Sequence, residues 1–373
     1  MTNADRRQIE ESVVSGASWE EFCDHLKRAG QQILRPEAPT DQLNRAEGFR
    51  YLSRLTRIAL DMHMESGDPS FPNFYSPSDE TAKIGADNPD NLYLRTEISS
   101  EHDYRIKGTR GSVHYLGFVT LRGGYGQDGQ NEQTGDLDHH NIQLNPDGSF
   151  EIIVSRDQHA NNWLPMQEDT STLLVRQTFL DRASETAADI TIERIGSSGA
   201  TPAPLNAVEF DRRLRSASAF VEGCARVFCD WSQGYLERPN QLPPADQAVC
   251  QAAGGDPNIF YYHGYWQLED DEALLIELNE IPECETWNFQ LNNYWMESLD
   301  YRYHRITVNK HTAQADGNGR VRIIIANNDP GVGNWIDTAG HRLGTMCFRW
   351  IRADHHPHPS CSIIKIAELE QLT

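Results

Sequence analysis

The sequence predicts a mainly β protein: two tandem jelly-roll-like β-sandwiches with an N-terminal helical segment and a connecting helix. Three observations predict this fold. One motif occurs twice, at residues 161–177 and 333–350, and each copy follows an apolar run. Short stretches of alternating polar and apolar residues recur between turn signals, which is typical of a sandwich or barrel. Residues 5–66 and 208–236 instead have apolar side chains at helical spacing.

The repeated motif is built around an Asn-Trp pair. The first copy contains Asn162-Trp163, and the second contains Asn334-Trp335, 172 residues later. An arginine follows each pair, and these two arginines, Arg176 and Arg349, are offset by 173 residues. A tight-turn signal precedes each copy. We interpret the repeat as the duplication of one β-rich module.

The first half of the chain divides into a helical segment and a sandwich. Residues 1–70 are expected to be helical, because Trp19–Leu26 and Asp41–Met64 repeat apolar residues every three or four positions. Ser18 is suited to be an N-cap. The first sandwich is expected over residues 71–200. Its strands are expected at 92–98, 103–108, 112–121, 141–144, 150–155, 173–179 and 189–195.

The second half repeats this arrangement. Residues 201–245 contain a linker and the connecting helix, which the apolar stripe from Phe210 to Trp231 predicts. The second sandwich is expected over residues 246–373. Its strands are expected at 264–268, 273–278, 286–291, 303–308, 321–326 and 344–351, with a closing strand or short helix at 362–369.

The charge and composition exclude several classes of function. The net charge is −22, so the surface repels nucleic acid and anionic membranes. No apolar stretch is long enough to span a membrane, and the N-terminus lacks the apolar core of a signal peptide. The seven cysteines are an odd number without a C-x-x-C pair, which favours reduced thiols and a cytoplasmic protein over disulfides or structural zinc.

Several motifs carry a resemblance to one known family. They are Arg45–Leu52, Gly85–Tyr93, Tyr104–Gly108, Asn162–Leu164 and Gly333–Arg342. Over residues 40–352 the chain resembles the family catalogued as domain of unknown function 1214, often paired with domain of unknown function 1254. The resemblance implies two consecutive jelly-roll sandwiches, a layout shared with some viral coat proteins and some carbohydrate-active proteins. It implies no settled activity.

The Asn-Trp pairs have two interpretations. Trp163 and Trp335 could each stack on a sugar or an aromatic ligand, with Asn334 as a hydrogen-bond partner. Alternatively, each asparagine caps a turn and each tryptophan closes one end of a sandwich. The duplication favours the second interpretation, because an active site is seldom needed at two equivalent positions.

Two further groups of residues could carry chemistry. Only the second copy of the motif adds Asp337, His341 and Arg342 ahead of Arg349, which could supply a general base and an anion clamp. The alternative is a hydrogen-bonded hairpin. The run 87–91, which includes Asp90, could bind Ca²⁺ or a sugar hydroxyl, or it could simply form a turn. Tyr93 and Arg95 follow at alternate positions and would face the same side of a strand.

The sequence predicts no metal and no cofactor. His139 and His140 are adjacent, so in a strand they would point to opposite faces and would not share an ion. His356 and His358 lie in a Pro-rich loop without a later strand histidine. The phosphate-binding, dinucleotide-binding and nucleophile-elbow motifs are missing.

Two functional hypotheses follow. In the first, the protein is an enzyme or binding protein for a polar small molecule, a saccharide or an organic acid, with a site on the second sandwich that faces the first sandwich or the helical segment. Asp337, His341 and Arg349 would be the catalytic residues, and Trp163, Trp335, Asn334, Asp90, Tyr93 and Arg342 would bind the ligand. In the second, the chain is a structural or assembly protein without catalytic activity. We expect a homo-oligomer in either case.

Overall fold

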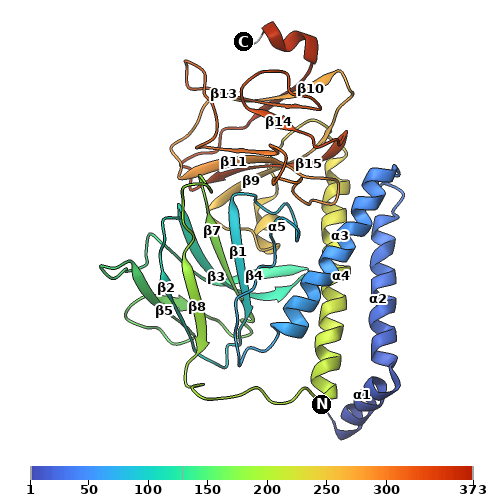
Figure 1. Ribbon diagram of the computed structural model, residues 1–373, viewed down its shortest axis with the longest axis vertical. Coiled ribbons are helices and arrows are strands. Elements are labelled where there is room, and N and C mark those ends of the chain that lie inside the picture. The colour runs from blue at the N-terminus through green and yellow to red at the C-terminus, as the bar shows by residue number, and fades with distance from the viewer. Residues whose placement is uncertain (1, 128, 372–373) are drawn as a thin grey trace.

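The protein consists of two β-sandwiches, a helical segment at the N-terminus and one long helix that runs beside both sandwiches (Figure 1). The computed structural model describes residues 2–127 and 129–371, so the outer limits of the expected divisions, residues 1 and 373, lie outside the described residues. This architecture confirms the predicted fold class. In the described part of the chain, no helix combines the length and the apolar character that crossing a bilayer requires.

Several helices begin at a side chain that accepts a hydrogen bond from a free backbone N–H group. The N-terminal segment contains α1 (Asn3–Ser15), α2 (Ala17–Ile33), α3 (Gln42–Leu60) and one π-helical turn, η1 (Asp61–Glu65). Asp41 caps α3, and Asn206 caps the long helix α4 (Ala207–Tyr235). Ser18, expected to be an N-cap, lies inside α2 and donates instead to Asp211 Oδ1 on α4 at 2.5 Å. The remaining helices are α5 (Gln247–Ala252) and the 3₁₀ helix η2 (Ile366–Gln371).

The first sandwich contains two four-stranded sheets. One has the order β1-β7-β3-β4, formed by β1 (Asn91–Glu97), β7 (Thr172–Thr178), β3 (Tyr115–Gly124) and β4 (Gln130–Asp138). The other has the order β6-β5-β2-β8, formed by β6 (Trp163–Pro165), β5 (Ser149–Ser155), β2 (Tyr104–Thr109) and β8 (Asp189–Arg194). Phe118, Ile152 and Val175 belong to the apolar core of this sandwich.

The second sandwich repeats this topology strand by strand. One sheet has the order β9-β15-β11-β12, formed by β9 (Ile259–Gln267), β15 (Leu343–Ile351), β11 (Thr286–Leu291) and β12 (Thr307–Asn309). The other has the order β14-β13-β10-β16, formed by β14 (Trp335–Asp337), β13 (Val321–Ala326), β10 (Glu272–Leu278) and β16 (Ser360–Lys365). Each Asn-Trp motif leads into the parallel edge strand, β6 or β14. The repeated topology supports a duplicated module.

Two expected strands differ from the structure. Residues 141–144 form a turn and a loop, and the strand that pairs with β3 is β4. The buried side chains of β4 include Asn131, Thr134 and Asp138, so the strand has no apolar alternation that the sequence could reveal. Most of 303–308 is a turn, and strand β12 begins at Thr307.

Successive side chains of a strand point to opposite faces of its sheet. The β1-β7-β3-β4 sheet and the β9-β15-β11-β12 sheet therefore each have one face toward a sandwich core and one face away from it. In β7, Val175 lies in the core of the first sandwich, whereas Arg176 points to the opposite face. In β15, Phe348 lies in the core of the second sandwich, and Arg349 points away from it. The two outward faces border one cavity. Helix α4 covers its side, and the second sandwich is stacked on the end of the first (Figure 1).

Candidate functional site

The two asparagines of the repeated motif make the same three hydrogen bonds. The Nδ2 of each donates to two backbone carbonyls at 2.7–3.0 Å, and the Oδ1 of each accepts one backbone N–H at 2.7–2.8 Å. The partners are Gln143 and Glu151 in the first copy and Gln314 and Arg322 in the second. These bonds use the amide fully and fasten the loop before β5 or β13 to the strand that follows.

The two tryptophans also occupy matching places. The indole N–H of Trp163 donates to the carbonyl of Ser155 at 3.2 Å, and that of Trp335 donates to the carbonyl of Ala326 at 3.0 Å. Both side chains are half-buried at the edge of their own sandwich. Each tryptophan therefore has a hydrogen-bond acceptor within its own sandwich.

The structure does not bring Asp337, His341 and Arg349 together. Asp337 accepts from His304 Nδ1 at 2.7 Å, whereas the His341 imidazole meets Glu47 of α3. Arg349 is turned toward the cavity between the sandwiches. Arg342 is exposed and pairs with a surface aspartate, Asp270, at 2.6 Å. These four residues thus belong to four different surroundings.

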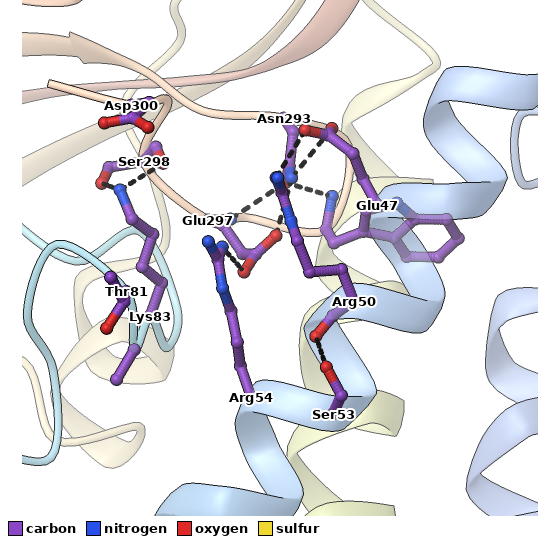
Figure 2. Close-up of polar contacts among 12 residues, drawn as sticks. Glu47, Arg50, Ser53, Arg54, Thr81, Lys83, Asn293, Glu297, Ser298 and Asp300 are labelled. Atoms are coloured by element: carbon purple, nitrogen blue, oxygen red, sulfur yellow. Dashed lines mark hydrogen bonds and ion pairs between the residues drawn. The ribbon is translucent and has the colours of Figure 1, made fainter. Parts of the chain in front are cut away.

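His341 takes part in a buried polar network that fastens α3 to the second sandwich. Glu47 Oε2 lies 2.8 Å from His341 Nε2, and Asn293 donates to Glu47 at 3.2 Å and to Glu297 at 2.8 Å. Arg54 of α3 donates to Glu297 at 2.6 Å. Figure 2 shows Glu47 and Arg54 of α3 converging with Asn293 and Glu297 of the loop after β11. Glu297 is 1% exposed, so the pairing offsets its cost of desolvation.

Opposite charges explain the pKa shifts of the Glu47–His341 pair, whereas burial raises the pKa of Glu297. Burial alone would raise the pKa of Glu47, but the hydrogen bond and the charge of His341 outweigh it and lower that pKa. Burial would likewise lower the pKa of His341, and the same contact with Glu47 raises it instead. Both directions favour a Glu47 carboxylate paired with a His341 imidazolium.

A cavity of about 180 Å³ lies between the two sandwiches and α4. Its lower wall comes from β1 and β7, its upper wall from β9 and β15, and its side from α4 and the loop after α5. The aromatic and aliphatic part of the lining includes Ile84, Leu121, Leu174, Phe220, Phe228, Trp231 and Ile259. Polar groups then converge on this mostly apolar space, as in many ligand sites.

The walls of the cavity carry a repeated cross-strand pair. Tyr93 of β1 lies opposite Arg176 of β7, and Tyr261 of β9 lies opposite Arg349 of β15. All four side chains line the cavity. The guanidinium of Arg349 is 6.0 Å from the centre of the Tyr261 ring. The duplication has therefore placed one tyrosine–arginine pair on each side of a single space.

The two arginines have neutral hydrogen-bond partners. Arg176 donates to the carbonyl of Gly254 at 2.5 Å, and Arg349 donates to Gln290 Oε1 at 2.6 Å and to the carbonyl of Ala86 at 2.5 Å. Among the described residues, no carboxylate forms an ion pair with either arginine within 4.0 Å. Burial opposes the charge of Arg176, yet nearby groups, Asp256 first among them, raise its pKa above the usual value. Both arginines remain cations.

The other charged groups of the lining are paired. Arg95 donates to Glu97 Oε1 at 2.9 Å, and Asp87 accepts from the backbone and the hydroxyl of Ser298 at 2.9 and 2.7 Å. Arg176 and Arg349 are thus the two cations of the lining that have no carboxylate within 4.0 Å among the described residues.

His263 lies on the upper wall among aromatic rings. Its imidazole stacks on Tyr235 and Tyr261, with centroids 5.7 and 6.0 Å away, and its buried Nδ1 has no hydrogen-bond partner among the described residues. Burial, with help from the charge of Arg349, lowers the pKa of His263 to about 3, so the ring is neutral. Burial also raises the pKa of the lining thiol Cys250 to about 12.

Of the remaining candidates, Tyr93 borders the cavity and Asp90 lies beside it. The Tyr93 hydroxyl accepts from the backbone of Asn88 at 3.2 Å and from Asn91 Nδ2 at 3.0 Å. Burial raises the pKa of Asp90 to about 6, even though Asn309 and Arg182 act in the other direction.

A wider cleft of about 530 Å³ adjoins the cavity. Arg95, Asn131 and Tyr125 border both spaces, and Arg212 and Arg213 line the outer one. Tyr125 follows β3 in the glycine-rich turn, and its hydroxyl donates to the carbonyl of Ala253 at 2.6 Å. Its side chain therefore lies at the boundary between the cleft and the cavity, together with Met62 and Phe220.

His139 and His140 do not lie in a strand. They follow β4 in a turn, and their ring centroids are 4.0 Å apart. The expectation that they point to opposite faces was wrong, because the strand ends at Asp138.

Sequence reasoning missed most of the cavity. Arg176 was recognised as the counterpart of Arg349 but was not selected, and Tyr261, His263 and Arg95 were not selected as site residues. The internal repeat could have indicated Arg176. It occupies the position in the first module that Arg349 occupies in the second, and the two residues lie on opposite walls of the cavity.

One solved structure has the same architecture as this chain. Residues 96–178 match the family described as "Protein of unknown function (DUF1214)". A crystal structure of an uncharacterised protein from Burkholderia cenocepacia is 54% identical, with a TM-score of 0.94, and the match covers 96% of this chain and 99% of that one. A Vibrio parahaemolyticus protein is 10% identical with a TM-score of 0.48, over 91% of this chain and 100% of that one. No functionally curated protein matches the chain.

Proposed function

Since this chain belongs to the DUF1214 family of proteins of unknown function, we propose its function from the geometry of the central cavity: it binds a small organic acid. The carboxylate of the ligand would lie between Arg176 and Arg349. The single observation that carries the proposal is the pair of buried guanidinium groups without a carboxylate partner among the described residues. A buried cation is costly unless an anion compensates it, and arginine matches the planar geometry of a carboxylate.

The lining and size of the cavity narrow the class of acid. Its volume of about 180 Å³ is below the range of drug-sized pockets, roughly 300–1,000 Å³. Phe220, Phe228 and Trp231 provide an apolar surface from α4. The ligand is therefore a compact acid with an apolar part, and two arginines favour it over a neutral saccharide.

The outer cleft offers a route to the cavity. It is lined by Arg95, Arg212 and Arg213, and each of these arginines pairs with a carboxylate, Arg95 with Glu97 and the other two with Glu209. The ligand would pass from this cleft to the cavity when the Tyr125 side chain moves.

The groups inside the cavity favour binding over acid–base turnover. The pKa of His263, about 3, leaves the imidazole uncharged at neutral pH, and the pKa of Cys250, about 12, leaves the thiol protonated. General acids and bases work best with a pKa near the operating pH. The site thus extends over both sandwiches instead of the second one alone, and its chemistry is recognition of an anion.

Isothermal titration calorimetry with aliphatic and aromatic mono- and dicarboxylates tests the proposal, with the matching amides as neutral ligands. Arg176→Gln and Arg349→Gln should each weaken binding of the acid by about tenfold or more, because each removes a charge-assisted hydrogen bond. Arg342→Gln is the matched control, since that arginine is exposed on the surface. A folded wild-type protein that binds no acid of the panel, or that binds the amides equally well, would overturn the proposal.

A further inference from the structure

Three histidines and one glutamate meet where the two sandwiches join, and none of the four lines the cavity. His114 precedes β3, His139 and His140 follow β4, and Glu285 precedes β11. The Nε2 atoms of His114, His139 and His140 lie 3.6, 3.9 and 3.3 Å from the nearer carboxylate oxygen of Glu285. The first sandwich thus supplies three imidazoles, and the second supplies the carboxylate.

We propose that His114, His139, His140 and Glu285 form a binding site for a divalent metal ion, with Zn²⁺ as the best match. One ligand atom from each of His139, His140 and Glu285 already falls within 4.8 Å of the other two. A tetrahedral zinc site needs bonds of about 2.0–2.2 Å to imidazole nitrogen and carboxylate oxygen. Small side-chain movements would reach that geometry, because His114 and His140 are 31% and 50% exposed and free to adjust.

The hydrogen bonding of the cluster points to a missing partner. His114 Nε2, which faces Glu285, is buried without a hydrogen bond among the described residues. Buried polar atoms are normally hydrogen-bonded, so this nitrogen indicates a missing partner.

Arg352 is the cation that competes for the same carboxylate. Its Nε lies 3.4 Å from Glu285 Oε2, and its Nη2 pairs with Asp138. The other carboxylate oxygen, Oε1, faces His114 and His139. Arg352 therefore contacts Oε2, which His140 Nε2 also contacts at 3.3 Å, and leaves Oε1 for the ion. His114 lies outside the close group of His139, His140 and Glu285 and would move in as the fourth ligand. A site closed by four protein ligands is typical of a structural metal.

Metal content of tag-free protein tests the site directly. After dialysis against EDTA and titration with Zn²⁺, the wild-type protein should retain one ion per chain, measured by inductively coupled plasma mass spectrometry. His140→Gln and Glu285→Gln should lose it. Co²⁺ in place of Zn²⁺ should give the visible absorption of a four-coordinate site, and both variants should lose that absorption.

His355→Gln is the matched control, because His355 is an exposed histidine that already contacts Asp354 and Glu280 at 2.7 Å. It should retain the ion. Circular dichroism establishes that each variant is folded, and the half-exposed His140 is the substitution least expected to disturb folding. A wild-type protein without stoichiometric Zn²⁺, or an ion that is lost in His355→Gln and kept in His140→Gln, would overturn the proposal.

Discussion

Arg176 and Arg349 are equivalent residues of the two sandwiches, and both border the same cavity. Each lies opposite a tyrosine on the neighbouring strand, and each bonds to neutral oxygen atoms instead of a carboxylate. Two copies of one structural position therefore meet across a single space. This relationship explains how a duplicated module can build one site instead of two.

The Tyr125 side chain is predicted to control access to the cavity. Tyr125→Phe removes the hydrogen bond to the Ala253 carbonyl and should lower the free energy of unfolding by about 0.5–1.5 kcal/mol. The affinity for the acid should change little, while association and dissociation should both become faster. Stopped-flow tryptophan fluorescence measures these rates, and Tyr303→Phe, at a tyrosine that is 79% exposed, is the control. Unchanged rates in Tyr125→Phe would rule out this role.

The Glu47–His341 pair predicts a loss of stability as the pH rises above neutral. The folded pKa of His341 is raised from 6.5, so its contribution is complete below pH 6.5 and disappears as the pH rises through the folded value. The folded pKa of Glu47 is lowered from 4.5, so its contribution is present above pH 4.5 and disappears as the pH falls through the folded value. The pair therefore stabilises the fold most between these two pH values.

Urea unfolding at about pH 5.5 and about pH 8.5 measures the effect. The wild-type protein should lose more stability between these two conditions than His341→Gln, which has no proton to release at this position. His355→Gln is the control, because its imidazole lies on the surface. An equal loss in the wild-type protein and in His341→Gln would contradict the assigned ion pair.

The motif asparagines are predicted to act on stability and not on ligand binding. Asn162→Ala and Asn334→Ala each remove three hydrogen bonds to backbone groups, so each should cost about 1–3 kcal/mol of unfolding free energy. Asn318→Ala, in an exposed turn, should cost much less. Chemical denaturation with a parallel acid titration separates the two effects. Loss of acid binding at full stability would instead assign a ligand role to the motif.

The fold could be predicted from the sequence wherever a strand has one apolar face. The strands that contain Ile152, Val175 and Phe348 are rich in apolar residues, because one face of each meets a sandwich core. Strand β4 could not be found in this way, because its buried side chains, such as Asn131 and Asp138, are polar.

The site was less accessible to sequence reasoning. Arg349 was identified because the repeat drew attention to it, and the neighbouring Asp337 and His341 were grouped with it by proximity in the chain. In the folded protein, His341 reaches Glu47 on α3, almost three hundred positions earlier. Local sequence carries no information about such a contact, because the packing of α3 on the second sandwich decides it.

Because both modules belong to one chain, equivalent positions on the two walls of the cavity can carry different residues. In a dimer of identical chains, equivalent positions on the two walls would carry the same residue. Here Arg95 on one wall corresponds to His263 on the other, and Leu174 corresponds to Cys347. The two walls have thus diverged while the arginines stayed alike. A ligand held between them can have two chemically different ends.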